Sequence, residues 1–265
     1  MAEETGGQSK ILVRGLSLLN GCSSSSSRLT LVEIADTTDF APSTVHRLLV
    51  TVEAQAFLSV DHETGRWRIG VSGFRIGDAY VRSRDYVARL RPLMIELSDR
   101  IGETVNLAIL SGSKALFVSQ IESANMTRMV APLSSWSPLD PSGAGEALLA
   151  VLDQEERTEL MAQLNFDAMT HKTLRSRASL FEEVERIITK SRSYDREEHV
   201  DGMCCVATPV FGELGAPIFA LSVTGPSIRV TEEVSVGHCD AVSKTAHTAT
   251  QLLGGVVPKH WSSDA

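Results

Sequence analysis

The sequence predicts an α+β protein in two parts. The first is helical and ends in a small hairpin, and the second packs helices on an antiparallel sheet. Apolar residues recur at helical spacing through the first third of the chain, two later pairs of segments alternate as strands do, and an amphipathic stretch joins the parts. With 265 residues, of which 43% are hydrophobic, the chain is long enough for two domains.

The composition disfavours several classes of protein. The chain has no apolar run long enough to span a bilayer, and its start, MAEETGGQSK, lacks the pattern of a signal or transit peptide. We therefore expect a cytoplasmic protein that does not engage a membrane. The four cysteines of such a chain argue against a disulfide framework. The net charge of −8 does not favour nucleic-acid binding, but a local basic surface decides that question.

The first predicted helix covers residues 11–20, and Gly21 is a plausible stop. Its apolar residues recur at helical spacing: Ile11, Leu12, Leu16 and Leu19. A run of serines at 23–27 then forms a short flexible linker.

Two further helices follow, separated by the break TTDFA. Thr30 can cap the first of them, and Pro42 fits the first turn of the second. The second helix buries Val45, Leu48, Leu49 and Val52. Its outer, N-terminal side carries polar residues: Ser43, Thr44, His46 and Arg47. This is how a recognition helix for the major groove of DNA is built.

A hairpin completes the first part. FLSVD and RWRIG are strand-like, and HETG supplies the turn, with Gly65 where a positive φ is needed. A helix-turn-helix followed by a hairpin is a winged helix, with Arg66 and Arg68 placed to meet phosphates beside the groove. The competing interpretation is a three-helix structural domain whose arginines are only solvated.

Residues 79–100 predict a long amphipathic helix with arginines on its polar side. Pro92 should kink this helix or end its first part, which suits a boundary between domains. Beyond it, ETVNLAIL and ALFVSQIE predict a hairpin around SGSK, and TRMVAP extends the sheet. Helices are predicted at SGAGEALLAVL and LFEEVERIITKSR, a second strand pair at MCCVATPVF and PIFALSVTG, and a final helix ending at Gly254.

Two features of the second part predict a polar pocket. Strand alternation puts Ser222 and Thr224 on one face, opposite Phe219, Leu221 and Val223. Gly143 and Ala144 open a helix whose free N–H groups suit a carboxylate. Each feature is weak alone, because buried hydroxyls commonly bond the backbone and every helix has an N-terminus.

The chain resembles the IclR family of bacterial transcriptional regulators. The first part matches through ILVRGLSLLN, LTLVEIAD, STVHRLL and RWRIG, and the second through ETVNLAIL, PSGAGEALLA, YDREEHVDGMCCVATPVF and ALSVTGP. The resemblance implies a regulator that is not an enzyme and needs no metal or other cofactor. It also implies binding to palindromic double-stranded operator DNA as a homodimer or a dimer of dimers.

The implied organisation is a disordered tail, a winged helix-turn-helix DNA-binding domain, a linker helix, an effector-binding domain and a C-terminal tail. In that order they occupy residues 1–8, 9–77, 78–92, 93–256 and 257–265.

The family branch that binds glyoxylate and pyruvate holds the small 2-oxoacid between the helix-opening loop and two strands. The matching positions here are Gly143, Ala144, Asp195, Cys205, Ser222 and Thr224, with Met126 and Met129 as an apolar lid. The carboxylate is expected at the N–H groups of Gly143 and Ala144 and at the two hydroxyls, and the aldehyde or its hydrate at Asp195 and Cys205. The resemblance thus implies that glyoxylate controls operator affinity, in a glyoxylate-consuming pathway such as the β-hydroxyaspartate cycle.

Three positions depart from the family pattern. Pro42 stands where lysine often precedes Ser-Thr-Val, which removes one basic contact. Glu146 stands directly after SGAG, where the family usually has lysine, and it would repel an anionic ligand unless its side chain points away. Thr224 stands where serine is more common, so the hydroxyl survives with an added methyl group.

Other chemistries stay open at this point. The same architecture could sense pyruvate or an aromatic acid. An enzyme would use Cys205 as nucleophile, His199 as base and Asp195 as orienting group, although no spacing brings them together. A metal sensor would recruit His199, Cys204, Cys205, His238 and Cys239. Consecutive strand residues point to opposite faces, however, so the two cysteines cannot easily share one ion. The resemblance assigns Cys205 to the effector, which leaves Cys204 facing the core.

Overall fold

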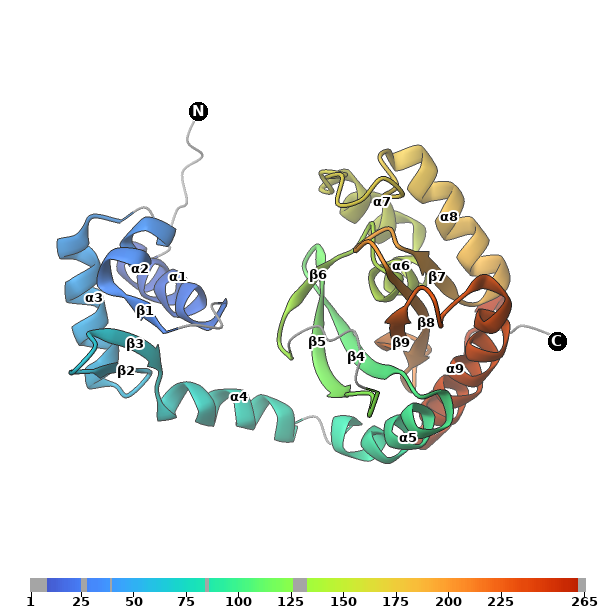
Figure 1. Ribbon diagram of the computed structural model, residues 1–265, viewed down its shortest axis with the longest axis horizontal. Coiled ribbons are helices and arrows are strands. Elements are labelled where there is room, and N and C mark those ends of the chain that lie inside the picture. The colour runs from blue at the N-terminus through green and yellow to red at the C-terminus, as the bar shows by residue number, and fades with distance from the viewer. Residues whose placement is uncertain (1–8, 25–27, 39, 84–85, 126–132, 262–265) are drawn as a thin grey trace. The chain divides into compact units, whose positions relative to one another are not determined.

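The protein is described from a computed structural model of the whole chain, and the described residues are 9–24, 28–38, 40–83, 86–125 and 133–261. The chain divides into two compact units, Met1–Asp85 and Tyr86–Ala265 (Figure 1), and each is described here by itself. The division falls within residues 78–92, the stretch expected as a linker.

The N-terminal unit is a helix-turn-helix with a small antiparallel sheet. In chain order its elements are α1 (Lys10–Ser24), β1 (Leu29–Thr30), α2 (Leu31–Thr38), α3 (Pro42–Ala54), β2 (Leu58–Asp61), β3 (Arg66–Ile69) and α4 (Val71–Ser83). The described strands pair antiparallel in the order β1-β3-β2. The core of the unit consists of Leu18, Cys22, Ile34, Ala35, Val45, Leu48, Leu49, Leu58 and Trp67.

The two central helices begin as predicted. The Thr30 N–H donates to Glu33 Oε2 (2.7 Å) while the Glu33 N–H donates to Thr30 Oγ1 (3.4 Å), so that α2 starts at a reciprocal cap. The hydrogen bonds that the Thr30 N–H and then the Thr30 hydroxyl donate to its carboxylate lower the pKa of Glu33. Helix α3 has Pro42 in its first turn and no side-chain cap from Ala41. Of its four predicted core residues, Val45, Leu48 and Leu49 are buried, and Val52 is half-buried against the same core.

The wing also forms as predicted. β2 pairs with β3, and Gly65 adopts a φ of +66° at the turn. The Gly65 N–H donates to the Asp61 carbonyl oxygen (2.7 Å), and Asp61 Oδ1 accepts from the N–H of Glu63 (3.0 Å). An aspartate that closes its own turn in this way fixes where the two strands reverse.

Helix α1 differs from its prediction. It continues through Gly21 to Ser24, and the residues it buries are Leu18 and Cys22. Of the four apolar residues predicted at helical spacing, Leu19 is half-buried against this core, whereas three are exposed: Ile11 (75%), Leu12 (62%) and Leu16 (52%). The sequence holds two apolar stripes on this helix, and only packing against α2 and α3 decides which one faces the core.

The predicted helix over residues 79–100 is also different. Helix α4 ends at Ser83 and α5 (Tyr86–Ile101) begins three residues later, whereas Pro92 lies inside α5. Proline removes one N–H donor and crowds the preceding turn. Pro92 is exposed, so water can satisfy the carbonyl oxygen that loses its partner, and the helix continues.

The C-terminal unit is built on an antiparallel sheet whose described strands have the order β6-β5-β4-β9-β8-β7 (Figure 1). The strands are β4 (Thr104–Ser111), β5 (Lys114–Ile121), β6 (Trp136–Pro138), β7 (Ser193–Arg196), β8 (Met203–Phe211) and β9 (Pro217–Pro226). The helices besides α5 are α6 (Gly143–Ala150), α7 (Gln154–Ala162), α8 (Arg177–Lys190), α9 (Glu232–Leu252) and a 3-10 turn, η1 (Lys259–Trp261).

The sheet separates two hydrophobic cores. Helices α5 and α9 cover one face, where Cys204, Val206, Leu221 and Val223 are buried. Helices α6 and α8 contribute to the core on the other face, with Ala207 and Ala220. The predicted alternation of β8 and β9 is therefore confirmed.

Three details of this unit were not predicted from the sequence. The helix α7 and the strand β7 were missed, and the edge strand next to β5 is Trp136–Pro138. The predicted strand TRMVAP, residues 127–132, lies outside the described residues. No helix among those described has the length and apolar character needed to cross a membrane.

Gly70 generates a test of the N-terminal fold. A Cβ atom added there would lie 2.3 Å from the Ala56 carbonyl oxygen and 3.0 Å from that of Leu58. Gly70→Ala should destabilise the N-terminal unit by about 1–3 kcal/mol, measured as lost hydrogen-exchange protection of the β2 and β3 amides. Gly77→Ala is the matched control, because nothing lies within 4 Å of its added Cβ. Equal protection in both variants would contradict the close approach at Gly70.

Candidate functional site

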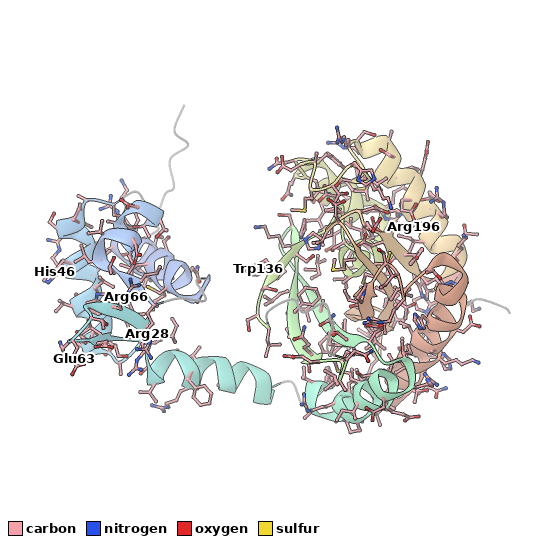
Figure 2. The ribbon with its side chains drawn as sticks, in the orientation of Figure 1. Arg28, His46, Glu63, Arg66, Trp136 and Arg196 are labelled. Atoms are coloured by element: carbon pink, nitrogen blue, oxygen red, sulfur yellow. The ribbon has the colours of Figure 1, made fainter. Side chains whose placement is uncertain are left out.

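The candidate DNA-binding surface lies on the N-terminal half of α3. Ser43, His46 and Arg47 are exposed, and Thr44 is half-buried. Figure 2 shows His46 on the outer side of this helix. The four predicted contact residues thus share one helix end, with three of them freely accessible to a groove.

The wing brings three arginines near one another, of which the sequence predicted two. Arg68 is exposed and its Nε donates to Ser59 Oγ (3.0 Å). The charge of Arg66 is only partly available to a phosphate, because its guanidinium donates to the Arg28 carbonyl oxygen (2.5 Å) and lies 3.6 Å from a Glu33 oxygen. Arg28, beside Arg66 in Figure 2, was not predicted. Only the β1–β3 pairing, which is not visible in the local sequence, brings Arg28 to the wing.

The C-terminal unit contains a cavity of about 390 Å³ next to the N-terminus of α6. Five of the predicted effector contacts line it: Gly143, Ala144, Asp195, Cys205 and Thr224. The sixth, Ser222, is fully buried behind the wall, and Met126 and Met129 lie outside the described residues. Polar and apolar residues that the sequence did not assign to the effector complete the lining: Asn106, Phe117, Ser135, Trp136, Ser137, Ser142, His199, Val200 and Met203.

Strand register gathers the predicted residues. Asp195 of β7 lies opposite Cys205 of β8, and Cys205 lies opposite Thr224 of β9, so the three form one row across the sheet. The next row on that face includes Ser222 and, opposite it on β4, Asn106. Asn106 Nδ2 donates to Thr224 Oγ1 (3.4 Å). A polar residue inside a strand of buried residues was the signal that could have found Asn106.

Helix α6 directs its first N–H groups at the cavity. Ser142 is its N-cap: the Ser142 Oγ accepts from the Gly145 N–H (3.1 Å) and donates to the Pro138 carbonyl oxygen (2.6 Å). The N–H groups of Gly143 and Ala144 have no acceptor inside the helix, as for every first turn. A Cβ on Gly143 would lie 3.1 Å from Cys205 Sγ, so glycine keeps this approach close.

Asp195 is the acidic group of the cavity. It is 1% exposed, and its Oδ1 accepts from the Glu198 N–H (2.7 Å). Its other oxygen, Oδ2, has no hydrogen-bond partner within the described chain. Burial, and after it the charge of Glu198, raises the pKa of Asp195 to about 7 against the lowering effect of that backbone bond. With this pKa, Asp195 titrates near neutral pH.

The remaining cavity groups are neutral at pH 7. Burial raises the pKa of the Cys205 thiol to about 12, and it lowers the pKa of His199. A nucleophilic cysteine needs a lowered pKa and a basic partner. Cys205 therefore has the wrong ionisation for the enzyme hypothesis.

The metal-sensor hypothesis is not supported by the geometry. Within residues that the structure describes, no group of three or more His, Cys, Asp or Glu side chains has an arrangement able to hold a metal ion. Cys204 and Cys205 also belong to opposite faces of the sheet, as the alternation predicted.

Two family models match the chain. The model of the IclR helix-turn-helix domain matches residues 11–62, and that of the C-terminal domain of the bacterial transcriptional regulator IclR matches residues 78–251. A helix-turn-helix joined to such a domain defines a DNA-binding transcriptional regulator with an effector-binding C-terminal domain, and not an enzyme. The chain belongs to the IclR family.

Similar proteins match over nearly the full length. The transcriptional repressor IclR of Escherichia coli K12 is 36% identical over 252 residues, which cover 94% of this chain and 92% of the repressor. The HTH-type transcriptional regulator BhcR of Paracoccus denitrificans is 37% identical over 258 residues, covering 97% and 91%. The crystal structure of an IclR homolog from Microbacterium hydrocarbonoxydans, complexed with 4-hydroxybenzoate, has the same fold, with a TM-score of 0.79, 20% identity and coverage of 92% and 99%.

The buried thiols allow a direct test of the cysteine chemistry. All four cysteines are free and buried, so iodoacetamide at pH 8 should label none of them rapidly in the folded protein and all of them in urea. Mass spectrometry of the Cys204–Cys205 peptide provides the measurement. Fast alkylation of Cys205 in the folded chain would contradict its raised pKa and revive the nucleophile.

Proposed function

We propose that this regulator binds palindromic operator DNA through α3 and the wing, and that a small 2-oxoacid, glyoxylate in the first place, controls this binding from the cavity of the C-terminal unit. The observation that carries the proposal is the convergence of the α6 N-terminus, Asp195 and Thr224 on one cavity. Bacterial genes of glyoxylate assimilation, transcribed in the cytoplasm, are the expected targets.

The DNA contacts follow from exposure and charge. Ser43, His46 and Arg47 present donors to base edges and phosphates from the N-terminal half of α3. Arg68 supplies further positive charge at the wing, and Arg28 and Arg66 add part of theirs, because Arg28 pairs with Asp61 and Arg66 faces Glu33. Because the whole chain carries a net charge of −8, this local basic surface has to provide the attraction to phosphate.

A second copy of the chain explains the exposed apolar residues of the N-terminal unit. Ile11, Leu12 and Leu16 on α1 are exposed, as are Phe74 and Ile76 on α4. Apolar side chains gathered on two helices of a small unit favour contact with another protein surface. A homodimer, or a dimer of dimers, also matches a two-fold symmetric operator.

The ligand contacts follow from the row across β7, β8 and β9. The carboxylate of the oxoacid accepts hydrogen bonds from the N–H groups of Gly143 and Ala144 and from the Thr224 hydroxyl. The aldehyde, as its hydrate, donates to the unpartnered Oδ2 of Asp195, with the neutral Cys205 thiol beside it. Ser222 lies one row further along the same face and is fully buried, and its Oγ has no hydrogen-bond partner among the described residues, so Ser222 supports the site from behind Thr224 and Cys205.

A larger acid is the second candidate effector. A cavity of about 390 Å³ has more room than a two-carbon acid fills, and Phe117, Trp136 and Met203 give it apolar walls. Pyruvate or an aromatic acid would use this space while keeping its carboxylate at α6. The 4-hydroxybenzoate complex of the IclR homolog makes an aromatic acid a sensible comparison ligand.

Control of DNA binding requires two conformations. An effector changes operator affinity only if it binds the DNA-competent and the incompetent conformations with different strength. The helices α4 and α5, which precede and follow the division between the units along the chain, are where such a change would be transmitted.

Thr224→Val tests the ligand site. Loss of a hydroxyl that donates to a carboxylate costs about 1.5–3 kcal/mol, so the dissociation constant of the effector should rise about 10- to 100-fold. Calorimetric titration with glyoxylate, pyruvate and 4-hydroxybenzoate measures it and ranks the ligands. Thr189→Val, at an exposed position of α8, is the control and should bind as the parent does. Unchanged effector affinity in Thr224→Val would contradict the proposed contact between the effector carboxylate and the Thr224 hydroxyl.

Arg47→Ala tests the DNA site. Removing one phosphate contact should weaken binding to an operator selected from a random duplex library and reduce the salt dependence by about one unit of slope. Fluorescence anisotropy at several salt concentrations provides both values. Effector affinity should not change, and Arg177→Ala, an exposed arginine of α8, should leave both properties intact. Parent-like operator binding by Arg47→Ala would contradict the assigned role.

A further inference from the structure

The carboxyl group of Glu146 is buried directly behind the cavity, with no exposure to solvent. Glu146 is the fourth residue of α6, three positions after Gly143, and it is 0% exposed. Its backbone N–H donates to the Ser142 carbonyl oxygen (2.8 Å), which holds it in the first turn. Neither oxygen of its side chain accepts a hydrogen bond from a donor in the part of the chain that the structure describes.

Acids from three elements surround Glu146. They are Glu183 of α8, Asp195 of β7, and Glu198 in the loop after β7, and all three are buried. The Glu198 carboxyl group lies within hydrogen-bonding reach of Glu146 and has an unpartnered oxygen of its own, Oε2. These four side chains form what we call the buried acid cluster.

The nearby positive charges of the described residues engage Glu183 and Glu198 and do not pair with Glu146. The Arg186 guanidinium pairs with Glu183 along α8, and Arg196 acts on Glu198 while its guanidinium carbon lies 4.4 Å from the Tyr194 ring centroid. From β8 comes the neutral thiol of Cys205, and His199 in the cavity wall has a pKa lowered by burial.

The other elements packed on α6 bring no buried charge. β4 and β9 supply only uncharged side chains, and Lys114, at the start of β5, is exposed. Glu197, next to Glu198, is paired with Lys172. The buried acid cluster is therefore short of positive charge in its own interior.

Physical chemistry leaves one way to keep such a group buried. An ionised carboxylate with neither a cation nor a hydrogen bond is far too costly in a protein interior, whereas a protonated one can donate to a neighbouring carboxylate. Burial first, and then the charges of Glu198, Asp195 and Glu183, raise the pKa of Glu146 well above its usual value. Burial likewise raises the pKa of Glu198.

We propose that Glu146 holds a proton that it shares with Glu198, and that through this cluster the cavity binds an anionic effector together with a proton. The second half rests on the function proposed above, and the first does not. An anion at the Gly143 and Ala144 N–H groups adds negative charge beside Asp195, and this favours proton uptake by the cluster. Linkage is reciprocal, so a lower pH strengthens anion binding.

Calorimetry of glyoxylate binding in PIPES and in triethanolamine at one pH measures the proton directly, because these two tertiary-amine buffers release their protons with different enthalpies and do not form imines with the aldehyde. The parent protein should take up a net fraction of a proton at pH 7.5. Its dissociation constant should rise between pH 6.5 and 8, by at most about tenfold per pH unit for one linked proton. Equal enthalpies in the two buffers, with binding intact, would overturn the linked proton.

Glu146→Gln identifies the group. The amide donates to Glu198 in place of the shared proton but cannot titrate, so proton uptake should fall below half of the parent value while glyoxylate still binds. Glu198→Gln should do the same from the other side of the shared proton. Glu182→Gln, an exposed acid on α8, should behave as the parent. Full proton uptake by both cluster variants would overturn the assignment to Glu146 and Glu198.

A measurement without ligand separates the two halves of the proposal. An acid whose pKa is raised by folding does not lower the free energy of unfolding while it is protonated at low pH. As the pH rises from its pKa in the unfolded chain, near 4, through its pKa in the folded chain, that stability is lost. The unfolding temperature of the parent should therefore fall between pH 5 and 8, and less so in Glu146→Gln. Equal slopes would overturn the shared proton. Failure of glyoxylate to bind at any pH, with the slopes different, would refute only glyoxylate as effector.

Discussion

The pairing of β8 with β9 is the constraint on which the C-terminal unit depends. Every residue of β8 after Met203 is buried, so the strand must satisfy two faces at once, one against α5 and α9 and the other toward α6 and the cavity. Alternation sends Cys204 and Cys205 to different faces. The register with β7 and β9 then aligns Asp195, Cys205 and Thr224. A slip of one residue would exchange core and cavity.

The cavity combines two opposing electrostatic features. The N-terminus of α6 attracts an anion, and the buried acids just behind it repel one. Alone, the N-terminus of α6 would indicate an anion site, and the buried acids alone would indicate a cation site. Together they make the charge state of Asp195, whose pKa is about 7, part of the binding energy. The effector proposed for this cavity would therefore bind with an affinity that depends on pH.

The two units differ in how their polar groups are satisfied by hydrogen bonds. In the N-terminal unit the reciprocal cap of Thr30 and Glu33 and the wing turn at Asp61 satisfy polar groups at exposed positions. In the C-terminal unit, Ser222, Asp195, Glu146 and Glu198 keep unpartnered atoms in buried positions. Native proteins tolerate few such atoms, and their concentration around one cavity marks the place where function outweighs stability.

Local patterns in the sequence determined much of this protein. The cap at Thr30, the proline in the first turn of α3, the turn glycine at Gly65 and the alternation of β8 and β9 are short-range effects. They identified the helix-turn-helix, the wing and the two faces of the sheet. The buried face of α1, the continuation of α5 through Pro92, the arrival of Arg28 at the wing and the acids around Glu146 were decided by tertiary structure. The reason is physical: periodicity and capping act within a few residues, whereas burial, strand register and charge depend on which distant segments the fold brings into contact.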